Sequence, residues 1–232
     1  MDVLLHTPAL SVYEHMALDE QTVQTRSQMV TLRFYHWTAE PAVTFGYAQF
    51  IREVRARLKT RGFAGAYARR PTGGGMVFHE DDLTFSLVFP SEDKPVAIYQ
   101  KLHTTLLAHL AQAGISGQLM HGPLPAEAYA PSVKQQASAC FIRPVENDLL
   151  TKSGQKMLGG AIRRLGTTVL YQGSLQLPAA RQHPVLKRAI INAVREFLAI
   201  DLRPVSCDET LLAQAKQLAV TQYNTLAWTE KF

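Results

Sequence analysis

The chain has 232 residues, of which 47% are hydrophobic and 19% charged, with 14 glycines and 12 prolines. This ordinary globular composition excludes a disordered chain, a coiled coil and a low-complexity protein, and the length fits one large domain. The formal net charge of +5 favours acidic partners, but the charges are too few and too scattered to indicate nucleic-acid binding.

No apolar run approaches the roughly 18 residues of a membrane span. The N-terminal sequence Met-Asp-Val-Leu-Leu-His-Thr-Pro lacks the basic and apolar regions of a signal peptide. The two cysteines, Cys140 and Cys207, cannot form a disulfide framework or a four-thiolate zinc site. We therefore expect a cytoplasmic protein without a membrane partner.

The hydrophobic pattern predicts the secondary structure in chain order. Apolar residues at helical spacing predict helices over 11–26, 52–61, 97–113, 183–198 and 209–219. Alternation and short apolar runs predict strands over 31–37, 42–45, 66–70, 76–79, 83–89, around Cys140, and over 148–151, 156–159 and 168–177. The polar, proline-rich stretch 121–136 is predicted to be a long loop. Antiparallel strands flanked by helices indicate an α+β fold, with one domain over 1–232 that ends in helices over 183–232.

The most unusual segment is Arg69-Arg70-Pro71-Thr72-Gly73-Gly74-Gly75. Three consecutive glycines let a ligand approach the backbone, so their amides, beside two guanidiniums, could bind a phosphate or carboxylate. The segment is neither a Walker A loop nor a dinucleotide fingerprint, because the Gly-Lys-Ser/Thr and the Gly-x-Gly-x-x-Gly are missing. From the spacing alone, it is equally well a hairpin turn with solvated arginines.

Three further residues could carry chemistry, and each has a structural alternative. His79 follows the glycines beside acidic residues, where a structural hydrogen bond is the better interpretation of the residue alone. Cys140 follows the long loop, where a nucleophile would need an activating setting, whereas most lone cysteines are inert core residues. Lys156 precedes Gly159-Gly160 and is either a buried cation that polarises a carbonyl or binds a phosphate, or a solvated hairpin lysine.

Taken together, the motifs resemble a known family. Residues 69–79, Arg-Arg-Pro-Thr-Gly-Gly-Gly-Met-Val-Phe-His, are similar to the Arg-Arg-x-Ser/Thr-Gly-Gly-x-x-Val-x-His signature of the lipoate–protein ligase and octanoyltransferase superfamily, which also contains biotin protein ligases. Further motifs of that family are resembled, in the same order, by residues 16–20, 34–37, 43–49, 147–149, 154–161 and 171–175. The resemblance covers most of residues 10–200. It implies a single α+β catalytic domain with mixed, mostly antiparallel sheets flanked by helices.

The family contains two kinds of enzyme. Ligases make an acyl-adenylate from ATP and free acid, whereas transferases take octanoate from acyl carrier protein and hold it on a cysteine. The segment Cys140-Phe141-Ile142-Arg143-Pro144, followed by Asp148-Leu149, resembles the Cys-Phe-x-x-Pro transferase branch. Asp82-Leu83-Thr84-Phe85-Ser86 also resembles the transferases, whereas the full glycine triplet and Asn147-Asp148 resemble the ligases.

The resemblance implies a role for each matched residue. Cys140 would be the nucleophile, Lys156 would activate its thiol and orient the carbonyl, and backbone amides of the glycines would stabilise the oxyanion. Arg69 and Arg70 would hold an anionic ligand or the acidic partner. The expected acyl- or adenylate-binding residues are Arg69, Arg70, Thr72, Gly73, Gly74, Gly75, His79, Asn147, Asp148, Gly159, Gly160 and Ala161. An apolar tunnel for the acyl chain would include Tyr35, Trp37 and Phe78.

A transferase of this kind would need no cofactor and no metal. Its donor would be acyl carrier protein, and its acceptor the lysine of a lipoyl carrier domain, in a 2-oxoacid dehydrogenase E2 subunit or a glycine cleavage H-like protein. The alternative is a ligase that uses ATP, lipoate or octanoate, and Mg²⁺ near Asp148, possibly with a separate accessory chain, while Cys140 merely packs. A non-catalytic carrier-binding protein would not need Lys156, the glycine triplet and His79 together.

Overall fold

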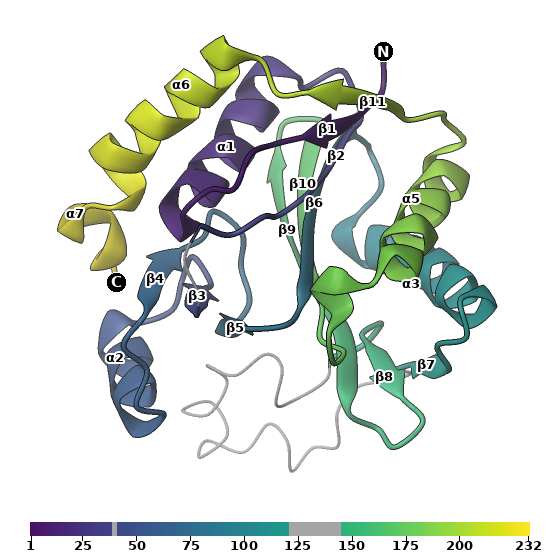
Figure 1. The fold of residues 1–232 in the computed structure, drawn as a ribbon, viewed down its shortest axis with the longest axis horizontal. Coiled ribbons are helices and arrows are strands. Elements are labelled where there is room, and N and C mark those ends of the chain that lie inside the picture. Colours follow the sequence, from purple (N-terminus) through teal and green to yellow (C-terminus); the bar gives the residue numbers. More distant parts are fainter. Residues whose placement is uncertain (39–40, 121–144) are drawn as a thin grey trace.

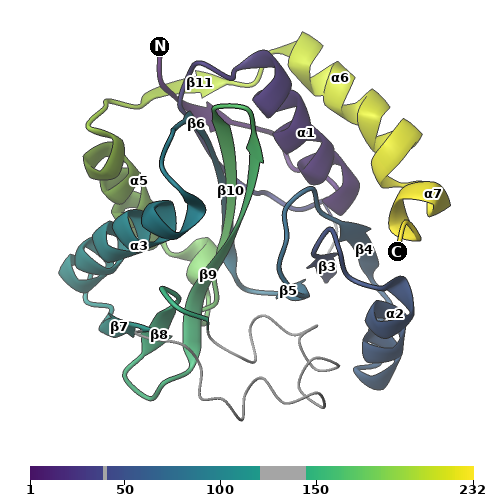
Figure 2. The same ribbon diagram turned by 180° about the vertical axis from the view of Figure 1, so that it is seen from behind.

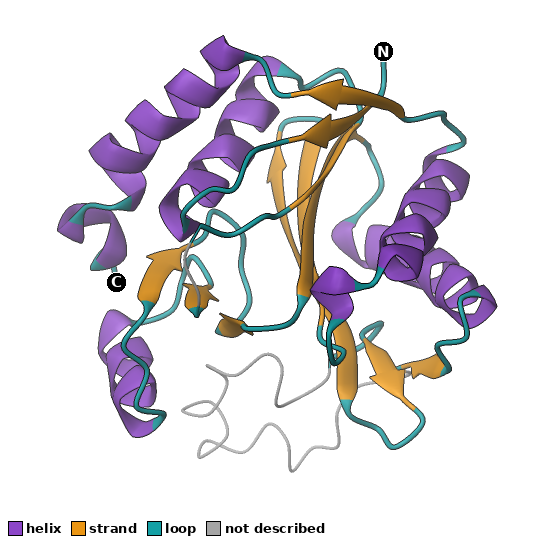
Figure 3. Ribbon diagram, viewed as in Figure 1, coloured by secondary structure: helices purple, strands orange, loops and turns teal. Residues whose placement is uncertain are grey.

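The computed structural model describes residues 1–38, 41–120 and 145–232, and these form two sheets with helices packed around them (Figures 1 and 3). The strands are β1 (Val3–His6), β2 (Thr31–Phe34), β3 (Ala42–Phe45), β4 (Ala66–Arg69), β5 (Val77–His79), β6 (Leu83–Pro90), β7 (Gly117–Leu119), β8 (Leu149–Thr151), β9 (Lys156–Leu165), β10 (Thr168–Leu175) and β11 (Arg203–Ser206). The helices are α1 (Val12–Thr25), α2 (Ile51–Thr60), α3 (Pro95–Gln112), α5 (Pro184–Leu198), α6 (Glu209–Leu218) and α7 (Leu226–Thr229), with short helical turns at Ala180–Gln182 and Ala219–Tyr223. The loop predicted over 121–136 and the strand predicted around Cys140 lie outside the described residues.

The larger sheet has the strand order β11-β1-β2-β6-β10-β9-β8-β7, and the smaller sheet has the order β4-β3-β5. The β11–β1, β1–β2 and β3–β4 pairs are parallel, and the remaining pairs are antiparallel. The predicted α+β class with mixed, mostly antiparallel sheets is confirmed. No helix in the described ranges is long and apolar enough to cross a bilayer.

Helices cover both faces of the larger sheet, with α3 and α5 on one face and α1 and α6 on the other (Figures 1 and 2). The alternation of strand side chains explains this arrangement. On β6, Leu83, Phe85, Leu87 and Phe89 join the apolar core beneath α3 and α5. The residues between them, Thr84 and Ser86, are buried on the opposite face. One face of the sheet is therefore apolar, while the other carries buried polar groups.

Helix α1 packs polar side chains against the face of the larger sheet that carries the buried polar groups. A capping box at Ser11 and Glu14 begins the helix, with Ser11 N donating to Glu14 Oε2 at 2.7 Å. Asp19, one turn further along, is fully buried and accepts from Arg33 Nη2 at 2.6 Å and from Ser86 Oγ at 2.6 Å. A buried carboxylate is tolerable only with such partners, so these contacts fix how α1 lies on β2 and β6.

The glycine segment is not a hairpin turn, so that alternative is wrong. Strand β3 lies between β4 and β5, pairing parallel with β4 and antiparallel with β5. The chain from β4 must therefore cross the end of β3 before it returns as β5. The crossing is tight, because a Cβ atom at Gly46, just after β3, would lie 1.7 Å from the carbonyl oxygen of Gly74.

Other predicted elements differ in length or were not predicted. Strand β2 ends at Phe34 and is buried at every residue, whereas an alternating strand to Trp37 was expected. Strand β9 continues to Leu165, well past Gly159. The short strands β1, β7 and β11 have no period of their own in the sequence, and pairing with distant partners creates them.

Candidate active site

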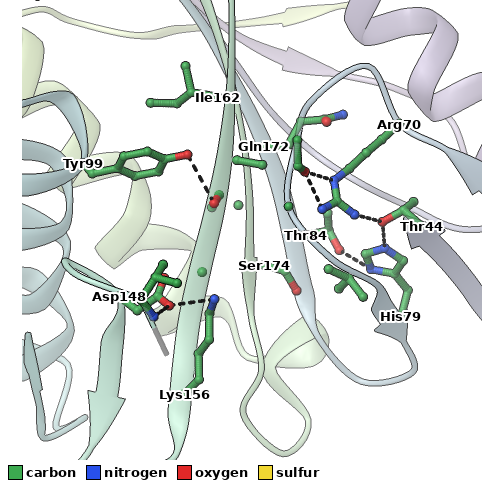
Figure 4. A pocket seen from close by; sticks show the side chains of 18 of the residues that line it. Thr44, Arg70, His79, Thr84, Tyr99, Asp148, Lys156, Ile162, Gln172 and Ser174 are labelled. Carbon is green, nitrogen blue, oxygen red and sulfur yellow. Dashed lines mark hydrogen bonds and ion pairs between the residues drawn. The ribbon is translucent and has the colours of Figure 1, made fainter. Parts of the chain in front are cut away.

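A cavity of about 280 Å³ opens between the smaller sheet and strands β9 and β10 (Figure 4). Its walls come from α1, α3, both sheets and the glycine segment. The predicted site residues that line it are Tyr35, Arg70, Gly73, Gly74, His79, Asp148, Lys156, Gly159, Gly160 and Ala161. Residues as far apart in the chain as Tyr35 and Ala161 thus share one cavity.

Lys156 is a buried cation in the wall of this cavity. Its side chain is 4% exposed, and its Nζ lies 2.8 Å from Asp148 Oδ2. Burial raises the pKa of the Asp148 carboxyl, although the Lys156 charge opposes that shift, and the amide of Val145 also donates to Oδ2 at 2.7 Å. The solvated-hairpin interpretation of Lys156 is wrong, because the carboxylate holds the ammonium group beside the cavity.

Arg70 holds the glycine segment in shape. Its Nε and Nη2 donate to the carbonyl of Gly73 at 3.1 and 2.7 Å, and its Nη1 donates to Thr44 Oγ1 at 3.3 Å. The amide of Tyr47 donates to the carbonyl of Thr72 at 2.8 Å. Gly74 has a φ of 85°, which glycine adopts without strain. The guanidinium and the exposed backbone at Gly73 and Gly74 therefore face the cavity as one rigid unit.

Two residues of the glycine segment lie behind the cavity wall. The side chain of Thr72 is fully buried, and its hydroxyl donates to Gln172 Oε1 at 2.6 Å. Gly75 is buried and is not part of the lining. Neither residue is part of the lining, so their binding role stays a prediction.

Arg69 does not hold an anion, which corrects the prediction for this residue. The side chain is fully buried, and its nitrogens donate to the carbonyls of Tyr47, Gln49, Trp228 and Thr229. Burial lowers the pKa of the guanidinium. Because four backbone carbonyls already receive its protons, Arg69 fastens α7 to the glycine segment and does not reach the cavity.

His79 lines the cavity and is also a structural hydrogen-bond partner. Its Nε2 lies 2.9 Å from Thr44 Oγ1, and its Nδ1 lies 2.9 Å from Asp82 Oδ2. Burial favours the neutral form of Asp82, but His79 and the hydroxyls of Ser174 and Thr84 outweigh it and lower the pKa of this carboxyl. The imidazole therefore connects Asp82, directly before β6 of the larger sheet, to Thr44, which also accepts from Arg70.

Trp37 and Phe78 do not line the cavity, so only Tyr35 of the predicted tunnel does. On β5 successive side chains alternate, and Val77 and His79 point inward, which turns Phe78 outward to pack against Phe63. Trp37 stacks on His79 from behind, with ring centroids 4.6 Å apart. These two aromatic residues support the wall and do not form it.

The glycines of β9 serve packing as well as the cavity. Gly160 pairs with Gly173 across β9 and β10, and a Cβ atom at Gly160 would lie 2.3 Å from the ring of Tyr171. Asn147 does not line the cavity. Its φ of 70° places it in the left-handed region, and its carbonyl accepts from His103. Cys140 lies outside the described residues, and Cys207 is half-buried with its thiol pKa raised by burial, as expected for an inert cysteine.

Several lining residues were not singled out from the sequence, among them Met16, Thr44, Tyr99, Gln172 and Ser174. Gln172 donates from Nε2 to Asp19 Oδ2 at 2.6 Å and to the Tyr35 hydroxyl at 3.1 Å. A sequence signal existed, because Gln172 and Ser174 are polar residues that alternate within an otherwise apolar strand.

From the sequence, Mg²⁺ was expected near Asp148 only for the ligase alternative. In residues 1–38, 41–120 and 145–232, no group of three or more His, Cys, Asp or Glu could hold a metal ion. Asp148 Oδ2 also already accepts from Lys156 and from the Val145 amide. In the described residues Asp148 is the ion-pair partner of Lys156.

Among the solved structures that share this fold are lipoate–protein ligases. A putative lipoate protein ligase from T. acidophilum with bound lipoic acid superposes with a TM-score of 0.78 at 21% identity, covering 100% of this chain and 98% of that one. A lipoate-protein ligase A bound with ATP gives a TM-score of 0.76 at 22% identity, covering 99% of each chain. At these identities the likeness defines the class of fold.

The chain belongs to the lipoyl protein ligase A/B catalytic domain family, whose model matches residues 11–190. It is 34% identical over 171 residues to octanoyltransferase LipM of Symbiobacterium thermophilum, covering 71% of this chain and 61% of that protein. It is 29% identical over 243 residues to the LipM of Brevibacillus brevis, covering 92% and 84%. The resemblance found in the sequence is confirmed, although the alignment spans about three fifths of the first relative.

Proposed function

We propose that this protein is an acyltransferase of protein lipoylation. It takes an octanoyl or lipoyl group from acyl carrier protein, holds it as a thioester on Cys140, and passes it to a lysine of a lipoyl carrier domain. The observation that carries this proposal is the buried Lys156–Asp148 pair in the wall of a cavity that the glycine segment also lines. The relatives named octanoyltransferase support the transfer of an octanoyl group.

The reaction has two acyl-transfer steps. The Cys140 sulfur attacks the donor thioester carbonyl, a new C–S bond forms, and the carrier thiol leaves with a proton. The amine of the acceptor lysine then attacks the enzyme thioester, an amide forms, and the Cys140 sulfur leaves and regains a proton. Lys156 is a cation in the cavity wall that can stabilise the oxyanion of each step and exchange these protons.

The floor of the cavity suits an extended acyl chain. Strand β9 rises about 3.3 Å per residue, so the backbone from Lys156 to Ala161 spans about 16 Å. Gly159, Gly160 and Ala161 present almost no side-chain volume along this stretch, whereas Met16 and Val77 provide apolar surface. An acyl chain that begins at Lys156 can therefore run along β9 toward Ala161.

The partners follow from charge and from the family. The net charge of +5 complements acidic carrier proteins and supports acyl carrier protein as donor. A structure with the same fold, at a TM-score of 0.72, is a bi-partite lipoate protein ligase from Thermoplasma acidophilum studied with its E2 lipoyl domain, which supports a lipoyl domain as acceptor here.

Intact-protein mass spectrometry tests the proposal. The enzyme is mixed with octanoyl acyl carrier protein in the absence of ATP, and we expect an octanoyl adduct that hydroxylamine removes. Cys140→Ala should abolish the adduct, whereas the matched control Cys207→Ala should keep it. If no adduct forms and a lipoyl domain is acylated only with ATP and free acid, the protein is a ligase and the proposal fails.

A further inference from the structure

A buried histidine that the proposed reaction does not use lies directly behind the Lys156 site. His103 on α3 is fully buried, between Tyr171 of β10 and the segment that precedes β8. Its Nδ1 donates to the carbonyl of Asn147 at 2.6 Å, and its Nε2 accepts from the Tyr171 hydroxyl at 2.8 Å. Both nitrogens of the His103 ring therefore form hydrogen bonds within the protein.

Two glycines make room for the Tyr171 ring. A Cβ atom at Gly160 would lie 2.3 Å from that ring, and a Cβ atom at Gly173 would lie 2.7 Å from it. These glycines face each other across β9 and β10. Glycine weakens a strand interior, so two facing glycines indicate that another group must approach the strands closely here. The space left by Gly160 and Gly173 lets the Tyr171 hydroxyl reach His103.

The other end of the hydrogen-bonded chain fixes the backbone of Asp148. The carbonyl of Asn147 and the amide of Asp148 belong to one peptide group. His103 binds its oxygen, and the carbonyl of Val145 accepts from its N–H at 3.0 Å. Asn147 is held in the left-handed region with φ of 70°. Because a peptide group is planar, these two contacts set the direction in which the Asp148 side chain leaves the backbone.

We propose that Tyr171 and His103 form a positioning relay that fixes the Asn147–Asp148 peptide and thereby aims Asp148 at Lys156. The inference rests on the proposed function, in which Lys156 acts on the acyl group and on Cys140. Neither relay residue touches the reacting atoms, so both act through Asp148.

The protonation state of His103 suits this role. Burial, with a contribution from the Lys156 charge, lowers the pKa of His103 to about 4 despite the opposing hydrogen bond to Asn147. The ring is then neutral near pH 7, with its single proton on Nδ1. Nε2 remains an acceptor for Tyr171.

Steady-state kinetics of His103→Gln and Tyr171→Phe test the relay, with His109→Gln as the matched control. His109 is a second hydrogen-bonded histidine of α3, 2.8 Å from Glu196 Oε2 and away from the cavity. We expect kcat to fall at least tenfold in His103→Gln and several-fold in Tyr171→Phe, with KM for the acceptor domain within twofold. His109→Gln should match the wild type. If His103→Gln does not fold, Tyr171→Phe decides, because it removes a single oxygen atom.

The rate at which iodoacetamide alkylates Cys140, measured in a Cys207→Ala background, separates positioning from general destabilisation. His103→Gln should slow alkylation in the wild-type context and have no further effect when Lys156→Met is present, because both substitutions then act through one group. Unchanged kcat in both relay variants, or an equal slowing with and without Lys156, would overturn the relay. If Lys156→Met itself keeps full activity, the proposed function fails as well.

Discussion

Arg69 and Arg70 are adjacent and carry the same charge, but their surroundings give them different tasks. Arg70 reaches the cavity and braces Gly73, whereas Arg69 is enclosed by backbone carbonyls that include those of Trp228 and Thr229. Arg69 is the last residue of β4 and Arg70 follows it, and successive side chains along an extended chain leave the backbone in opposite directions. The sequence identified the pair but could not distinguish its members, because two of the carbonyls around Arg69 belong to Trp228 and Thr229, about 160 positions away.

Asp82 allows a residue-scale prediction. This buried carboxylate accepts from His79, Thr84 and Ser174 and pairs with Arg181. Burial raises its pKa, but His79 and the two hydroxyls outweigh burial and lower the pKa below the ordinary value of 3.8. A lowered folded-state pKa adds stability above the unfolded pKa, and that stability is lost as the pH falls through the folded value. We expect Asp82→Asn to destabilise the protein by about 3 kcal/mol at pH 7, since it breaks a buried charge pair.

Urea unfolding of both proteins between pH 7 and pH 3 measures this effect. The difference in unfolding free energy between wild type and Asp82→Asn should stay constant down to about pH 4 and shrink below it. A difference that grows as the pH falls would contradict the assignment of Asp82 as a stabilising buried anion.

At the scale of elements, hydrogen bonds in both directions join α7 to Arg69 at the start of the glycine segment. Arg69 donates to the carbonyls of Trp228 and Thr229, and Trp228 Nε1 donates back to the carbonyl of Arg69 at 2.9 Å. The segment between β4 and β5 therefore derives part of its rigidity from the last helix. The glycines could be recognised in the sequence, but their support by α7 could not.

The prediction at this scale concerns Arg69→Met. The substitution leaves buried carbonyls without a donor, so we expect it to lower the free energy of unfolding by about 3 kcal/mol. It should also reduce the formation of the octanoyl adduct, because the glycine segment loses its support. Arg55→Ala is the control, since it removes surface interactions, an exposed ion pair with Glu230 and a hydrogen bond with Tyr67, and should change stability little. Equal effects of the two substitutions in thermal unfolding would refute the assigned role of Arg69.

Over the whole molecule, the two ends of the described chain pack on each other. Strand β1 pairs in parallel with β11, and Arg26, directly after α1, pairs with Asp208 at the start of α6. Leu211 and Ala215 of α6 lie in one apolar cluster with Met16 and Leu18 of α1. Residues beyond 200 therefore complete the core around α1.

These contacts predict one cooperative unfolding unit over residues 1–232, as the single-domain interpretation of the sequence requires. Differential scanning calorimetry should give one transition whose calorimetric and van't Hoff enthalpies agree. Two separate transitions, or an early loss of the 200–232 region in hydrogen exchange, would contradict a single domain.

The sequence by itself determined the α+β class, most of the elements, the family, and the segments that line the cavity. Lys156, Gly73 and His79 could be recognised because residue type and spacing are local properties. Only the tertiary structure decided that Phe78 and Trp37 stand behind the wall, that Arg69 binds the C-terminal helix, and that His103 reaches Asn147. Those outcomes depend on the direction of each side chain and on partners distant in the chain, which form only when the sheets and helices pack together.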